Sequence, residues 1–228
     1  MRIATWNVHG CVGTDGRFSP ERTAAVLHRL EAEVIALQEV YDNRDGTEGF
    51  DGFDFFQRHH GPHTVVAHTI RDSRHTYGHM LCSRWPVDGS ALHDISVEGR
   101  EPRILVDAQV RHEQFGHVRV LSTHLGLRAG ERRRQSEILH RLLRRQPDIP
   151  TLVLGDFNQV RRSGGVFRGL AREFASPAAP ATFPAQRPMF ALDRIWSRPA
   201  HLIRRLWTWR EDRAASDHLP VLAELHVG

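Results

Sequence analysis

The sequence predicts an α/β (α+β) fold in which two mainly antiparallel or mixed β-sheets are flanked by helices. Many short apolar segments of strand length follow one another along the 228 residues, and only a few amphipathic helices interrupt them. With 40% hydrophobic residues the chain can bury a substantial core, which argues against a disordered or fibrous protein. No linker-like stretch divides it, so we expect one domain over residues 1–228.

The N-terminal part predicts strand, helix, strand and loop in that order. Residues 2–6 form the first expected strand. Ser19 is an expected N-cap, because Pro20 after it suits the first position of a helix. Residues 34–37 are a second buried strand. Residues 42–62 are rich in Gly, Asp and aromatic residues, and we expect a long surface loop there.

The remainder of the chain is predominantly strand. Ile104, Val106, Ala108 and Val110 are apolar at every second position, as in a half-buried strand. Residues 131–145 form the clearest helix, because apolar residues share one side and its Arg-rich end suits the helix dipole. We expect a second helix at 165–173, loop at 174–188, and further strand or strand-like segments at 64–70, 77–83, 87–95, 103–110, 117–123, 151–155, 191–196, 202–209 and 219–227.

Composition limits the class of protein. Cys11 and Cys82 are too few for a disulfide framework and lack metal-ligand spacing, which fits a reducing compartment. The N-terminus has no apolar leader, and no run of about 18 apolar residues is present. We therefore expect a cytoplasmic protein without a transmembrane segment.

The basic residues are all arginine. The chain carries 31 of them, no lysine, and a formal net charge of +4. Arginine presents forked donors that suit phosphate. The balance favours anionic substrates without choosing between nucleic acid and lipid headgroups.

Polar side chains recur at the predicted strand ends. Asp156 and Asn158 follow an apolar strand, and their i, i+2 spacing puts both on one face of an extended chain. Gly155 before them allows a turn or a close backbone approach. Such a pair suits a hard cation, a phosphate or both, although an Asx turn explains it equally well. Polar residues at other strand ends are Asn7, Glu39, His124, Asp193, Asp217 and His218.

Each of these residues also has a structural explanation when taken singly. Glu39 fits an exposed charge, His124 a satisfied core histidine, and Asp193 an ion-pair partner of a neighbouring arginine. If the strand ends converge, however, the clustered carboxylates are costly to bury without a metal or mutual pairing. Their joint recurrence therefore favours a functional site.

The segments that carry these residues resemble, in their order along the chain, the endonuclease/exonuclease/phosphatase superfamily. Its members include deoxyribonuclease I, exonuclease III, inositol polyphosphate 5-phosphatases and neutral sphingomyelinases. The resemblance spans essentially the whole chain and implies a four-layered α/β sandwich with the site at one edge. The matching segments are Thr5-Trp6-Asn7-Val8-His9-Gly10, Leu37-Gln38-Glu39-Val40, Ser122-Thr123-His124-Leu125, Gly155-Asp156-Phe157-Asn158, Leu192-Asp193-Arg194-Ile195 and Ser216-Asp217-His218-Leu219-Pro220.

The resemblance implies Mg²⁺-dependent hydrolysis of a phosphoester, with Mn²⁺ as a possible substitute. Glu39 is the expected metal anchor, with Asn7 beside it, and Asp217 is a ligand if a second metal binds. Asp156 would orient or deprotonate the attacking water, and Asn158 would hold a phosphate oxygen.

The histidines complete the implied chemistry. His218 would contact the phosphate as donor or act as base, with Asp193 orienting its other ring nitrogen. His124 would be a second phosphate contact or an acid. His79 stands where many members carry Asn, so it is a candidate substrate contact, with a structural role as the alternative. Arg103, in a Glu-x-Arg element, is a candidate phosphate ligand.

The substrate stays open at this level. A general phosphodiesterase or phosphomonoesterase is the leading expectation; a repair-type DNA nuclease, a sphingomyelinase-like phospholipid hydrolase and a non-catalytic binding protein are alternatives. We expect a monomer without a stable protein partner. Aromatic residues of the 42–62 segment either contact substrate or pack, and the arginines of the 131–145 helix form either a nucleic-acid patch or a solvated face. These residues are Phe50, Phe53, Phe55 and Phe56, and Arg132, Arg133, Arg134, Arg141, Arg144 and Arg145.

Overall fold

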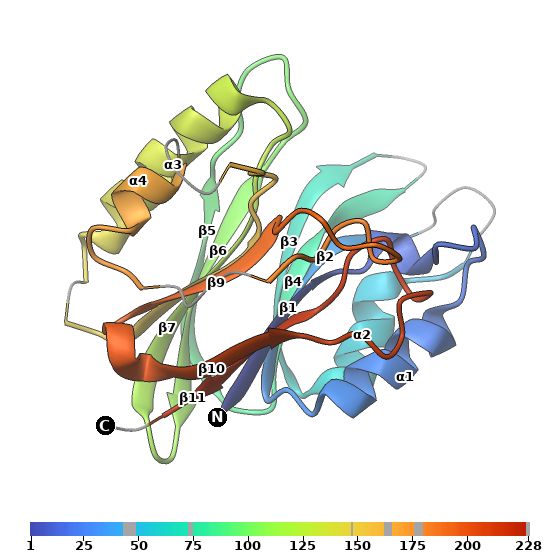
Figure 1. Cartoon of the computed structure of the whole chain (residues 1–228), viewed down its shortest axis with the longest axis horizontal. Helices are drawn as coiled ribbons and strands as arrows, with labels where there is room; N and C mark the ends of the chain where they lie inside the picture. The colour runs from blue at the N-terminus through green and yellow to red at the C-terminus, as the bar shows by residue number, and fades with distance from the viewer. Residues whose placement is uncertain (43–48, 73–74, 147, 162–165, 176–179, 227–228) are drawn as a thin grey trace.

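Two β-sheets pack face to face, and helices cover the outer face of each sheet (Figure 1). The expected four-layered α/β sandwich is thereby confirmed. The structure is a computed structural model, and it describes residues 1–42, 49–72, 75–146, 148–161, 166–175 and 180–226.

The first sheet has six strands. Its central pair, β1 and β2, is parallel, and the other neighbours are antiparallel. The strand order is β10 (Ile203–Thr208), β11 (Val221–Leu225), β1 (Arg2–Asn7), β2 (Val34–Asp42), β4 (Thr76–Ser83) and β3 (His63–Arg71).

The second sheet has five strands and repeats this plan. β7 and β8 are parallel, and the remaining pairs are antiparallel. The strand order is β5 (Val87–Asp94), β6 (Ile104–His112), β7 (Gly116–His124), β8 (Thr151–Asp156) and β9 (Asp193–Arg198).

The helices form the two outer layers. α1 (Pro20–Leu30) and α2 (Gly52–His60) bury their apolar faces against the six-stranded sheet. α3 (Ala129–Leu143) and α4 (Val166–Leu170) do the same on the five-stranded sheet. Short 3₁₀ turns lie at η1 (His9–Cys11) and η2 (Ala200–Leu202). No described helix combines the length and apolar character needed to cross a lipid bilayer.

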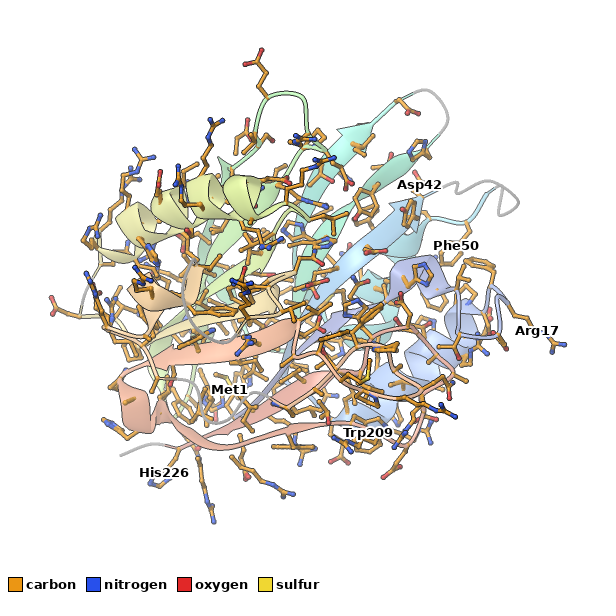
Figure 2. The ribbon with its side chains drawn as sticks, turned by 45° about the horizontal axis from the view of Figure 1, so that its top comes forward. Met1, Arg17, Asp42, Phe50, Trp209 and His226 are labelled. Carbon is orange, nitrogen blue, oxygen red and sulfur yellow. The ribbon has the colours of Figure 1, made fainter. Side chains whose placement is uncertain are left out.

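The middle of the sandwich is the apolar space between the sheets. It is filled from both sides by short aliphatic residues such as Ile3, Val106 and Leu154, all fully buried. Side chains occupy the space between the layers throughout the molecule (Figure 2). Burial of this aliphatic surface is the main favourable contribution to folding, at about 25 cal/mol per Å² removed from water.

The prediction of a long surface loop at residues 42–62 is wrong in part. β2 extends to Asp42, and α2 occupies residues 52–60, while 43–48 lie outside the described residues. Asp51 caps the helix by accepting a hydrogen bond from Asp54 N at 2.9 Å. Phe53 and Phe56, spaced i, i+3, are buried against the sheet. A turn-like composition concealed an N-cap followed by an amphipathic helix, and the aromatic residues pack there.

Other differences concern the ends of elements. The helix expected at 131–145 is α3, two residues earlier, and the strand expected at 191–196 is β9, two residues later. The helix expected at 165–173 is the shorter α4, and residue 165 lies outside the described part of the chain. The last strand starts only after Pro220, which has no N–H to donate to the ladder.

The two parallel pairs determine where the polar strand ends meet. β1 and β2 leave Met1's end of the molecule and finish at the Asp42 end (Figure 2). β7 and β8 finish beside them, because β8 contacts both β1 and β2 across the sandwich. In register, His124 lies opposite Asp156, and Asp156 lies opposite Asp193. The carboxyl ends of four strands therefore share one edge.

Candidate active site

A cavity of about 530 Å³ opens at this edge. Six of the predicted site residues contribute to its polar lining, and apolar side chains complete the wall. The lining consists of Glu39, Tyr41, Ile70, His75, Tyr77, Glu101, Arg103, His124, Leu127, Asp156, Asn158, Phe183, Leu192 and His218.

Gly155 is required for the approach of β8 to β7. Its φ is +138°, and a Cβ at this position would lie 1.9 Å from the carbonyl oxygen of Thr123. Any side chain would push the strands apart. The glycine therefore permits the register that sets Asp156 beside His124.

Glu39 projects from an irregularity in β2. The register with β4 shifts between Leu37 and Val40, and Glu39 has a left-handed φ of +57°. Bulges of this kind re-aim a side chain, and a non-glycine residue held there stores about 1–3 kcal/mol of strain. The strain directs the Glu39 carboxylate towards the cavity.

One amide joins the two carboxylates of the polar wall. Asn7 Nδ2 donates to Glu39 Oε1 at 2.8 Å and to Asp156 Oδ2 at 3.2 Å. The amide is held in place because Asn7 Oδ1 accepts a hydrogen bond from His9 N at 3.0 Å. The amide of Asn7 thus donates to both carboxylates. A cation beside them would offset the remaining cost of burying their negative charges.

Asp156 and Asn158 form an Asx turn at the wall of the cavity. Asp156 Oδ1 accepts a hydrogen bond from Asn158 N at 2.8 Å, which is an Asx turn. Asn158, at a φ of +48°, donates from Nδ2 to Leu125 O at 2.8 Å. Both residues nevertheless line the cavity. Burial, reinforced by the charge of Asp193, raises the pKa of Asp156 above its usual range.

His218 is paired with a buried carboxylate. Its Nδ1 lies 2.7 Å from Asp193 Oδ2, and its Nε2 lies 3.9 Å from Asp156 Oδ2. The ring of Phe183 packs against the imidazole at a centroid distance of 4.9 Å. Burial alone would lower the pKa of His218, but the carboxylate of Asp193, with smaller contributions from Asp156 and Asp217, raises it to about 10. The raised pKa favours the protonated ring, and His218 lines the cavity.

The pKa of His124 is shifted in the opposite direction from that of His218. Its Nε2 lies 3.6 Å from Asp156 Oδ2, and its Nδ1 lies 3.5 Å from both Tyr77 OH and Arg103 NH1. Arginine has only donors, so Nδ1 accepts and the proton is on Nε2. Burial and the positive charge of Arg103 lower the pKa of His124 well below its ordinary value. His124 is therefore a neutral donor that faces the carboxylates.

The predicted residues separate into two groups. Asn7, although outside the lining, touches Glu39 and Asp156, and Asp193 touches His218, so these two belong to the site. His79 and Asp217 do not line the cavity.

His79 is 1% exposed, and burial lowers its pKa to about 3, so a direct substrate contact is not supported. Asp217 is partly exposed, with its carboxylate 3.7 Å from His9 Nδ1. It does not line the cavity, and its role as a ligand of a second metal stays a prediction.

Arg103 lines the cavity, and one nitrogen of its guanidinium, NH1, is already engaged. NH1 donates to Glu101 Oε1 at 2.6 Å and to Tyr77 OH at 3.5 Å. Sequence reasoning missed Tyr77 and Glu101 as parts of the site. Glu101 stands in the Glu-x-Arg element, and Tyr77 is two residues from His79 on the same face of β4, so period-two spacing is the signal that would have found it.

Asp156, Asp193 and His218 also hold possible ligand atoms within 4.8 Å of one another. The short contact between His218 and Asp193 makes this group a carboxylate–imidazole pair. Mg²⁺ prefers oxygen ligands and keeps several waters. The carboxylate of Glu39, which lines the cavity, suits it better.

Comparison with known proteins identifies the relatives of this chain. It is 28% identical over 254 residues to the Escherichia coli (strain K12) protein YbhP, described as uncharacterized, covering 100% of this chain and 96% of that one. The crystal structure of an endonuclease/exonuclease/phosphatase from Beutenbergia cavernae DSM 12333 superposes with a TM-score of 0.82 at 22% identity, covering 100% and 71% of the two chains. The Bacteroides thetaiotaomicron VPI-5482 mannosyl-6-phosphatase Bt3783 superposes with a TM-score of 0.76 at 13% identity, covering 100% of both.

The family profile matches almost the whole chain, over residues 4–218. The matched region contains every residue of the polar wall, from Asn7 to His218. The description of this family names enzymes that hydrolyse phosphoester bonds. The chain belongs to the Endonuclease/Exonuclease/phosphatase family.

Proposed function

We propose that this chain is a Mg²⁺-dependent phosphoesterase that hydrolyses a phosphodiester or phosphomonoester by attack of an activated water. The observation that carries the proposal is the convergence of Glu39, Asp156 and His218 on one cavity, with the pKa of His218 raised by Asp193. Two carboxylates beside an imidazolium form a site where a cation, a phosphate and a water can be held together.

Glu39 and Asn7 fit a hard divalent cation. Glu39 offers a carboxylate at the cavity wall, and within the described part of the chain its one hydrogen bond comes from Asn7 Nδ2 at 2.8 Å. The amide oxygen of Asn7 is a suitable second ligand if the side chain turns over. A bound Mg²⁺, or Mn²⁺ in its place, would neutralise charge that develops on the phosphate oxygens.

Asp156 is the proposed base. It is ionisable, it faces the cavity, and its raised pKa makes it a better proton acceptor near neutral pH than an ordinary aspartate. Its Oδ1 is held by Asn158 N, so Oδ2 is the oxygen available to orient and deprotonate water. His218 is unsuited to this role because it is already protonated.

Three donors remain to hold the phosphate. His218 donates from Nε2 with a full positive charge, His124 donates from Nε2 as a neutral ring, and Asn158 lines the same wall. Charged donors strengthen hydrogen bonds to phosphate roughly twofold over neutral ones. His218 is therefore expected to stabilise the transition state most, and Asp193 acts through it.

The phosphoester that the chain cleaves belongs to one of three classes. A phosphomonoester is supported by the fold it shares with a mannosyl-6-phosphatase, while nucleic acid and phospholipid headgroups are the alternatives to test. The proposal includes a monomer that acts without a stable protein partner. We place the activity in the cytoplasm.

The test is hydrolysis by purified protein with Mg²⁺ across a panel of phosphoesters. The panel contains bis(4-nitrophenyl) phosphate, 4-nitrophenyl phosphate, mannose 6-phosphate, single-stranded and abasic DNA, RNA, and sphingomyelin. Asp156→Asn and His218→Asn are expected to lower kcat about 10²–10⁴-fold on the best substrate. Equal rates in the parent and both variants would overturn the mechanism, and no turnover of any substrate would favour a binding protein that keeps the fold.

A metal titration tests the cation independently of turnover. A ligand that binds only the native state raises its stability, by about 2.7 kcal/mol at 100 times Kd. Thermal unfolding with millimolar Mg²⁺ or Mn²⁺ should shift upward in the parent and not in Glu39→Gln. An equal shift in both proteins would place the cation elsewhere.

A further inference from the structure

A second cavity, of about 310 Å³, adjoins the first. Glu101, Arg103 and Leu127 line both cavities, so the two form one groove that runs from the catalytic wall past Leu127. The second cavity adds Arg100 and Arg128 at its far end, together with Gly99 and Glu131. This groove extends from the site but takes no part in the chemistry proposed above.

The charges in the second cavity are distributed unevenly. Glu101 is paired with Arg103 at 2.6 Å, and Glu131 is buried and accepts a hydrogen bond from Gln135 Nε2. Arg100 and Arg128 are exposed, and within the described part of the chain neither guanidinium has a carboxylate partner. Both carboxylates of the second cavity are therefore engaged, whereas Arg100 and Arg128 have no carboxylate partner among the described residues.

One large apolar side chain stands at the junction between the cavities, beside the ion pair of Glu101 and Arg103. Leu127 is 73% exposed, the most exposed large hydrophobic residue in the described chain, and it stands between the catalytic wall and the two arginines. Exposed leucine in a groove contacts ligand more readily than it contacts water. A ligand that fills the groove thus meets the catalytic wall first, then Leu127 beside the paired Glu101 and Arg103, and then the two outer arginines.

We propose that Arg100 and Arg128 form a second anion-binding subsite, which receives a phosphate of the substrate other than the one that is cleaved. The proposal rests on the phosphoesterase function and narrows its substrate class to phosphoesters with at least two phosphates separated by a neutral unit. A strand of oligonucleotide and a small bisphosphate share this chemistry. Sphingomyelin, with a single phosphate and a cationic headgroup, does not.

Matched dinucleotides test the subsite by turnover. The substrates dTpdT, pdTpdT and dTpdTp differ only in a terminal phosphate. The parent is expected to show a kcat/KM about tenfold higher for at least one phosphorylated form than for dTpdT, mainly through KM, because each charged contact to phosphate contributes a strong hydrogen bond. The double variant Arg100→Gln/Arg128→Gln should lose this preference. Arg134→Gln, which removes an exposed charge from α3 outside both cavities, should keep it.

A binding measurement separates failure of the subsite from failure of the enzyme. Fluorescence anisotropy of labelled pdTpdT is recorded in EDTA across a salt series, with the full chain. Single-stranded nucleic acid releases about 0.7 counterions per neutralised phosphate, so the double variant should lower the slope of log Kd against log salt by about that amount. Arg134→Gln should leave the slope unchanged.

The outcomes are distinct. Salt-dependent binding lost in the double variant, without hydrolysis of any substrate, supports the subsite and overturns the phosphoesterase function. Hydrolysis with equal kcat/KM for all three dinucleotides, unaltered in the double variant, overturns the subsite alone. A parallel comparison of butane-1,4-diol bisphosphate with butyl phosphate identifies the source: a larger preference there than among the dinucleotides assigns the subsite to small bisphosphates, and a smaller one assigns it to a strand.

Discussion

Asp193 Oδ2 lies 2.7 Å from His218 Nδ1, and this contact determines the charge of the imidazole that faces the cavity. The two residues are 25 positions apart and come from β9 and from the segment before β11. Because the carboxylate is fully buried, it interacts with the ring through protein and not through water. The pair makes His218 a permanent donor and leaves Asp156 as the proton acceptor.

Asp193→Asn should therefore remove the negative charge that raises the pKa of His218. An amide has nearly the same shape but no charge, so the pKa of His218 should fall from about 10 towards its ordinary value of 6.5 or below. NMR titration of the ring protons measures this shift directly. We expect kcat to fall about 10²-fold or more, as for a misoriented catalytic imidazole. A pKa that stays near 10 would mean that another group holds the charge.

Glu39→Gly should stabilise the protein while removing its activity. Glycine adopts a φ of +57° without the Cβ clash that a left-handed residue suffers, which is worth about 1–2 kcal/mol. Glu39→Ala removes the same carboxylate but keeps the Cβ, so it is the matched control. Urea unfolding should give Glu39→Gly about 1 kcal/mol more stability than Glu39→Ala. Equal stability of the two variants would show that the backbone at position 39 is unstrained.

Gly155→Ala should be severely destabilising. The new Cβ would lie 1.9 Å from Thr123 O, and the φ of +138° is unfavourable for any L-residue. We expect a loss of about 3 kcal/mol or more in urea unfolding, with loss of activity because Asp156 moves. Gly89→Ala, on exposed β5 with nothing within 4 Å of its Cβ, is the control and should change stability by less than about 0.5 kcal/mol. Similar losses in both would contradict this account.

His60 should make stability fall in mild acid. Burial, with a smaller effect of Arg84, lowers its pKa from 6.5 to about 4. Between these values the unfolded chain binds a proton that the folded chain does not, so stability decreases as the pH falls below 6.5. At about 1.4 kcal/mol per pH unit the loss approaches 3 kcal/mol at pH 4.

Urea midpoints at pH 7 and pH 5 measure the effect. His60→Leu should shrink the difference between the two midpoints, and His59→Gln, at an exposed position in the same helix, should preserve it. If both variants keep the full difference, the acid sensitivity arises at other histidines, of which His79 and His124 are the buried candidates.

Much of the fold follows from local patterns. Apolar runs such as 152–154 predict buried strands because removal of their surface from water dominates folding. Ser19 and Pro20 predict the start of α1, where Ser19 Oγ accepts from Arg22 N at 3.4 Å. α2 was missed because Asp51 and Gly52 are equally at home in a turn. The ends of strands also shifted by a few residues, since neighbouring strands decide where the ladder stops.

The sequence by itself determined the family, the layered fold and the polar residues at the strand ends. Only the tertiary structure decided which of those residues meet. His79 and His124 are both strand histidines, yet one is enclosed between the sheets and the other faces Asp156. Asp217 and His218 are adjacent, yet only the imidazole lines the cavity. The reason is geometric: strand periodicity gives the face of a side chain, and the packing of one sheet on the other decides whether that face opens on a cavity or on the core.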